Sequence, residues 1–213
     1  MKLLLNAYPH AGVEQLYLMV ASSIRDNRTS NFHEMAEGDE WTIFKKEPII
    51  LLGDYGNDVS LFTIVRNPLE NIAMNIDAWF SGLTGQLIYG NEVLDTNNIK
   101  KSSGLTEKEY KFLTHQIEVY KSYMVCTQRN SKVNIIKYED LINKREESVK
   151  KILDMSGFNS KFMNYDALSQ APIEFDVPRT EYFEEIKTHI ENHKDYPEVL
   201  NLYKEVYSKS ITV

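Results

Sequence analysis

The spacing of apolar and polar residues changes several times along the chain, and each change predicts a junction between a strand and a helix. The segment "KLLLNAY" is a short, continuous apolar run, typical of a strand buried on both faces in a parallel sheet. Beyond Gly12 the apolar residues recur at helical spacing, at Val13, Leu16, Met19, Val20 and Ile24. We therefore predict a strand, a turn that contains a glycine, and a helix.

A second junction follows the apolar segment "SLFTIV", which predicts a strand over residues 60–65. In "RNPLENIAMNIDAWF" the period then changes from two to about 3.6. Asn67 is a favourable N-cap, Pro68 suits the first helical position, and Glu70 is stabilised in the first turn by the helix dipole. Arg66 is then the first residue beyond the strand.

The second half of the chain continues the alternation. A long helix is predicted from residue 106 to about 128, because "TEKE" forms a capping box and apolar residues follow on one face, namely Tyr110, Leu113, Ile117, Tyr120 and Met124. The segment "KVNIIKY" predicts a buried strand over 132–138, and "REESVKKILDMSGF" predicts a helix that stops at Gly157.

Other segments have weaker or different patterns. Two amphipathic helices are expected near 179–192 and 196–209, and "PIILLG" at 48–53 is a candidate strand. Scattered Gly, Asn and Pro residues predict irregular structure over about 81–105 and 158–178.

This alternation predicts the α/β class, with a central parallel sheet flanked by helices in three layers. Nothing in the composition divides the chain, so a single domain over residues 1–213 is expected. Ligands of such sheets bind outside the carboxyl ends of the strands, which places the turn at 8–14 and Arg66 on one edge. Backbone amides at a helix N-terminus and a nearby guanidinium both bind anions, so we expect a ligand with two phosphates.

Charge and cysteine content narrow the function classes. A net charge of −7 and a pI near 5.3 argue against a protein that binds nucleic acid along its phosphates. Cys126 is alone, so an intrachain disulfide is impossible. The apolar run at the N-terminus is too short for a signal peptide or a membrane span, so we expect a cytoplasmic protein without membrane contact.

Three segments, in order and at matching spacing, resemble the sulfotransferases that use 3′-phosphoadenosine 5′-phosphosulfate (PAPS). "NAYPHAGVEQL" resembles the family's 5′-phosphosulfate loop, "IVRNPLENIAMNIDAWF" its 3′-phosphate motif, and "VNIIKYEDLINKREESVKKILDMSGF" the strand and helix near its C-terminal third. The resemblance implies a P-loop type of fold and transfer of a sulfonate from PAPS to a hydroxyl or amine. It also implies 3′-phosphoadenosine 5′-phosphate (PAP) as product, a small-molecule or glycan acceptor, and no metal.

Carried over position by position, the resemblance assigns donor binding to Arg66 and to the loop residues Pro9, His10, Ala11, Gly12, Val13 and Glu14. His10 stands where the family has the lysine that neutralises charge on the oxygen bridging phosphate and sulfate. The family's base for the acceptor hydroxyl comes from the region between the first two motifs. Glu47 is our choice for it, with His33 and Asp54 as rivals.

The chain also departs from the family's usual loop, Tyr-Pro-Lys-Ser-Gly-Thr-Thr-Trp. Val13 and Glu14 replace the two hydroxyl residues, Gln15 replaces the tryptophan that stacks on adenine, and Met74 replaces the serine of the 3′-phosphate motif. A Glu14 carboxylate about 4 Å from a phosphate would cost about 4 kcal/mol. If Glu14 instead faces water, the helix dipole stabilises it and the loop amides remain available.

These departures leave two classes open: a divergent PAPS-dependent sulfotransferase, and a catalytically inactive sulfotransferase-like binding module in which "YPHAG" is only a tight turn. A nucleoside or small-molecule kinase is disfavoured, because the sequence contains no GxxxxGK[ST] motif.

Overall fold

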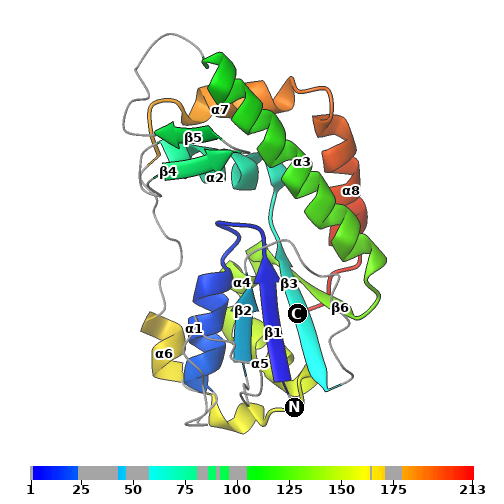
Figure 1. The fold of residues 1–213 in the computed structure, drawn as a ribbon. Coiled ribbons are helices and arrows are strands. Elements are labelled where there is room, and N and C mark those ends of the chain that lie inside the picture. The colour runs from blue at the N-terminus through cyan, green and yellow to red at the C-terminus, as the bar shows by residue number, and fades with distance from the viewer. Residues whose placement is uncertain are drawn as a thin grey trace.

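The computed structural model describes most of the chain, over residues 2–23, 43–46, 58–80, 86–89, 92–95, 105–163, 165–170 and 179–213. Within these residues the fold is mixed α/β, with a four-stranded sheet of order β2-β1-β3-β6 in which every neighbouring pair is parallel. The strands are β1 (Lys2–Ala7), β2 (Ile43–Lys46), β3 (Val59–Val65) and β6 (Val133–Lys137). Figure 1 shows β1, β2 and β3 running side by side in one direction.

Helices cover both faces of this sheet, because alternate residues of its strands belong to two separate hydrophobic clusters. Leu3, Leu5 and Ala7 pack into a cluster with side chains of α1 (Val13–Ser23) and α5 (Arg145–Met155). Leu4 packs into the other, with side chains of α2 (Pro68–Phe80), α3 (Glu107–Arg129), α7 (Phe183–Glu191) and α8 (Tyr196–Ser208). A strand that is apolar on both faces is thus buried on both, as predicted from "KLLLNAY".

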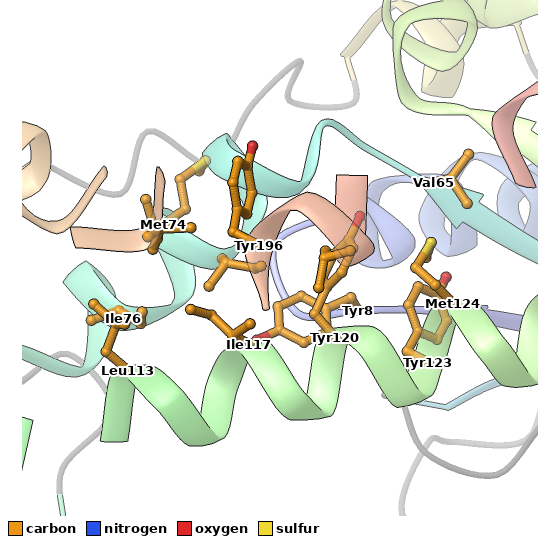
Figure 2. Close-up of a cluster of buried hydrophobic side chains, with 14 of the residues drawn as sticks. Tyr8, Val65, Met74, Ile76, Leu113, Ile117, Tyr120, Tyr123, Met124 and Tyr196 are labelled. Carbon is orange, nitrogen blue, oxygen red and sulfur yellow. The ribbon is translucent and has the colours of Figure 1, made fainter. Parts of the chain in front are cut away.

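Most predicted elements are confirmed with boundaries close to those expected. Asn67 accepts the amide of Leu69 at 2.9 Å and begins α2 at Pro68. The capping box at Thr106 is present, and α5 ends just before Gly157, which has a φ of +74°. Of the five residues in the predicted apolar stripe on α3, Tyr110 is 44% exposed and does not belong to the core. The other four are buried in the cluster that contains Leu4 (Figure 2).

The two segments predicted to be irregular contain short elements. The first includes an antiparallel hairpin of β4 (Gln86–Tyr89) and β5 (Glu92–Asp95). The second includes a 3₁₀ turn, η2 (Ser160–Phe162), and α6 (Tyr165–Gln170). A short helix, α4 (Tyr138–Asn143), directly follows β6 and was not predicted. The candidate strand at 48–53 lies outside the described residues.

The strand order determines where the connecting loops meet. β2 pairs with one side of β1, and β3, the next strand along the chain, pairs with the other side. The connections after β1 and β3 therefore leave the sheet in opposite directions, which opens space at the carboxyl ends of these two strands. In Figure 1 the loop after β1 lies at that end of the sheet, next to α2.

Among the described helices, none combines the length and hydrophobicity required to cross a membrane.

Candidate functional site

The loop between β1 and α1 is a tight turn with two residues in the left-handed region. The amide of Ala11 donates to the carbonyl of Tyr8 at 3.1 Å and closes the turn. His10 has a φ of +60° and Gly12 a φ of +88°. Few residues other than glycine adopt such angles, although histidine is among the more tolerant. The backbone of "YPHAG" is thus held in a specific conformation at the start of α1.

Gly12 is required here for a second reason, because the Tyr138 ring lies directly against it. A Cβ atom at Gly12 would come within 3.2 Å of Cε2 of Tyr138 and 3.5 Å of Cδ2 of Leu141. Tyr138 is the first residue of α4, immediately after β6. The third segment of the family resemblance therefore packs against the first.

Arg66 belongs to the second of the three segments, and its side chain contacts both the loop after β1 and Tyr138. Its side chain is 7% exposed, and Nη1 donates to the carbonyl of His10 at 2.9 Å. The guanidinium carbon lies 4.1 Å from the centre of the Tyr138 ring, in a cation–π contact. Arg66 and the loop are thus in direct contact at the carboxyl ends of β3 and β1, as the sheet argument predicted.

The loop has another side-chain partner on α2. Nδ2 of Asn71 donates to the carbonyl of Pro9, and the Asn71 side chain is only 1% exposed. The sequence analysis did not identify this residue, because asparagine within a helix has many roles and its partner is 62 residues away. Asn71 and Arg66 together bind two consecutive carbonyls of the loop.

Tyr8, the first residue of the loop, fixes the start of the loop through hydrogen bonds of its side chain. Its buried hydroxyl donates to Oε1 of Gln116 at 2.7 Å and accepts Nδ2 of Asn75 at 3.2 Å. Asn75 also donates to Gln116 at 2.7 Å, which closes a triangle of polar groups. Burial raises the pKa of the Tyr8 hydroxyl, so it remains protonated and acts as a fixed hydrogen-bond donor.

The environment of His10 opposes a positive charge. Partial burial lowers the pKa of its imidazole from the usual 6.5, and the nearby Arg66 guanidinium lowers it further. In the protein without an anion, His10 is therefore neutral at pH 7. His10 can supply the positive charge of the family's lysine only if a bound dianion raises the pKa of its imidazole against burial and the Arg66 charge.

The remaining loop residues are placed differently from one another. Pro9 and Glu14 are half-buried, and Glu14 lies in the first turn of α1. The amide of Ala11 donates within the turn, so it is not a donor for a ligand. Val13 is 6% exposed and belongs to the cluster under α1, so its side chain is a core residue.

The proposed bases cannot be placed. Glu47, His33 and Asp54 lie outside the described residues. Met74, at the position of the family's serine, is 8% exposed and packs into the cluster with α3.

The arrangement brings together two kinds of N–H donor that are suited to an anion. The first amides of a helix have no carbonyl partner within it, and those of α1 begin at a loop that Arg66 contacts.

Over the part of the chain that is described, no group of three or more His, Cys, Asp and Glu side chains could hold a metal ion. No protein-family model matches this chain, and no curated protein matches it.

Proposed function

We propose that the protein is a sulfotransferase of the P-loop type, which transfers a sulfonate from PAPS to a hydroxyl or amine of a small-molecule or glycan acceptor. The observation that carries this proposal is the 2.9 Å hydrogen bond between Nη1 of Arg66 and the carbonyl of His10. It brings a guanidinium to the loop at the start of α1, where two anionic groups of one ligand could be bound together.

In this proposal the 5′-phosphosulfate group of the donor binds at the N-terminus of α1, beside Gly12, Val13 and Glu14. Arg66 binds the 3′-phosphate, using a guanidinium that carries five N–H donors. His10, once protonated beside the bound dianion, stabilises the negative charge that develops on the bridging oxygen during transfer. Glu47 remains our choice for the base that accepts the proton of the acceptor hydroxyl.

The alternative function is a sulfotransferase-like binding module without turnover. Two observations favour it: the side chain of Val13 is in the core, and His10 lacks the charge of the family's lysine. Such a module would retain the loop conformation but bind the donor weakly or not at all.

Calorimetric titration with PAP separates the two functions. An enzyme binds PAP, and the Arg66→Ala variant should bind it about 1.5–3 kcal/mol more weakly, which is the scale of a charge-assisted hydrogen bond. Binding of 5′-AMP, which lacks the 3′-phosphate, should change little. Sulfonate transfer from PAPS to a panel of phenols, alcohols and amines then tests turnover.

Because Arg66 is buried, its replacement also affects the loop, so controls are needed. Arg66→Lys retains the charge and should retain part of the affinity, whereas Arg129→Ala removes an exposed arginine at the end of α3 and should have no effect. Each variant is checked by circular dichroism and urea unfolding. No PAP binding by the wild type at millimolar ligand would favour the module, and equal losses for PAP and 5′-AMP would reject the role of Arg66.

A further inference from the structure

One face of α3 presents three polar side chains to the ends of β1 and β3. Gln116, Tyr120 and Tyr123 occupy positions i, i+4 and i+7, which align on a helix. Gln116 accepts the hydroxyl of Tyr8, and Tyr123 donates to the carbonyl of Ile64 at 2.9 Å. Figure 2 shows both tyrosines of α3 pointing from the helix toward the strand ends.

Tyr120 has the most direct connection to the candidate site. Its hydroxyl donates to the backbone carbonyl of Arg66 at 2.7 Å, and its side chain is fully buried. Its ring meets the Tyr8 ring edge to face, with the centroids 4.8 Å apart. Tyr120 thus contacts the residue that carries the guanidinium and the first residue of the loop that the guanidinium binds.

The carbonyl of Arg66 is placed where the sheet no longer fixes the backbone. The last paired residue of β3 is Val65, which is opposite Lys137 of β6. Arg66 lies one residue beyond it and two before Pro68, the start of α2. The Tyr120 hydroxyl therefore holds the backbone at a junction whose conformation determines where the Arg66 side chain begins.

We propose that Tyr120 is a positioning residue of the donor site, which holds the Arg66 backbone so that the guanidinium reaches both the His10 carbonyl and the 3′-phosphate. This role rests on the proposed function. Tyr120 does not touch the ligand, and its effect is transmitted through Arg66. A buried hydroxyl with a single backbone acceptor also gives a sharp test, because replacement by phenylalanine preserves the ring and removes only the bond.

The test compares Tyr120→Phe with Tyr123→Phe, its matched control. Both changes remove a buried hydroxyl that donates to a carbonyl of the β3 segment, but Tyr123 acts two residues earlier, at Ile64, and its hydroxyl is also hydrogen-bonded to that of Thr63. In calorimetry with PAP, Tyr120→Phe should lower affinity about tenfold, as expected for the loss of one well-formed hydrogen bond. Affinity for 5′-AMP should change less than twofold, and Tyr123→Phe should bind both ligands as the wild type does.

A double mutant shows whether the effect passes through Arg66. In an Arg66→Ala background, Tyr120→Phe should cause no further loss of PAP affinity, because the group that it positions is absent. A loss that remains about tenfold in that background, or one shared equally by Tyr123→Phe, would overturn the positioning role. If the wild type binds no PAP, the proposed function fails first, and Tyr120 then has no donor site to position. Urea unfolding of each variant confirms that the compared proteins are folded.

Discussion

At the scale of single residues, His10 combines two unfavourable features. Its backbone is in the left-handed region at a φ of +60°, and its partly buried imidazole lies near the Arg66 cation. A strained backbone persists only where the surrounding contacts hold it, and here Arg66 binds the His10 carbonyl. Burial of the imidazole, and to a smaller degree the guanidinium that this contact brings close, therefore lower the pKa of His10.

This environment predicts a pH dependence of stability. The pKa of His10 is lower in the folded protein than the usual 6.5, so the unfolded chain binds the proton more readily as pH falls. The free energy of unfolding should thus decrease as pH falls through 6.5, and the His10 contribution should be complete above that value. We expect His10→Asn, which also tolerates a positive φ, to lose less stability than the wild type between pH 7.5 and 5.

Urea unfolding at several pH values measures this difference. The other histidines are present in both proteins, so their titration cancels in the comparison. A difference between the two proteins that is constant from pH 7.5 to 5 would show that His10 titrates normally.

The residues of the site differ in how far the sequence could predict them. Arg66 was predictable, because a strand followed by Asn-Pro places it at the edge where the β1 loop also lies. Tyr138 and Asn71 were not, because their roles arise from packing between segments that are far apart in the chain. No local pattern distinguishes a tyrosine that stacks on Arg66 from one at an ordinary strand end.

At the scale of elements, α2 carries the site residue Asn71 and is held in turn by α7. The buried carboxylate of Asp77 on α2 accepts the amide of Thr180 at 2.9 Å and also its hydroxyl. The carbonyl of Thr180 accepts the amide of Phe183, the first residue of α7, at 3.2 Å. Asp77 therefore fixes the turn that leads into α7.

We predict that Asp77→Ala lowers the free energy of unfolding by about 2–3 kcal/mol, because it removes a buried carboxylate and leaves two donors of the half-buried Thr180 without their acceptor. Thr180→Ala is the matched control. It removes the hydroxyl, which also accepts the amide of Tyr182 at 3.2 Å, and leaves the amide of Thr180 bonded to Asp77, so it should cost about 1–1.5 kcal/mol. Urea unfolding measures both. Equal losses for the two variants would mean that the amide bond contributes nothing.

Helices and strands were predicted correctly where the spacing of apolar residues and the helix caps agreed. They were missed where the elements are only a few residues long. The strands over β1, β3 and β6 and the caps at Asn67 and Thr106 follow from local chemistry. The hairpin β4–β5 has four-residue strands, too short for a period to be distinguished from irregular chain. Tyr110 fits the apolar stripe of α3 in sequence, but its side chain is 44% exposed and its ring meets those of His189 and His193.

At the scale of the whole molecule, the order of the strands favours a ligand at the site, whereas the net charge of the protein disfavours an anionic one. The order β2-β1-β3-β6 brings the ends of β1 and β3 together, so it favours a ligand there. The net charge of −7 disfavours an anionic ligand over long range, and Glu14 adds a carboxylate in the first turn of α1. The affinity of this loop for an anionic ligand depends on how these two effects balance.

Neutralising Glu14 tests that balance. Glu14→Gln keeps the size and helix propensity of the side chain while removing its charge, so PAPS and PAP should bind about tenfold more tightly if their 5′ group lies at the N-terminus of α1. Glu146→Gln is the matched control, because Glu146 is an exposed glutamate in the first turn of α5 and should leave affinity unchanged. The gain at Glu14 should shrink as salt is raised from 50 to 500 mM, since screening weakens the repulsion that the change removes. Calorimetry measures both variants under both conditions. A folded Glu14→Gln protein that binds the donor no better than the wild type would show that the Glu14 carboxylate does not face the 5′ group, and the substitution of the family's hydroxyl residue by Glu14 would then not weaken donor binding by repulsion.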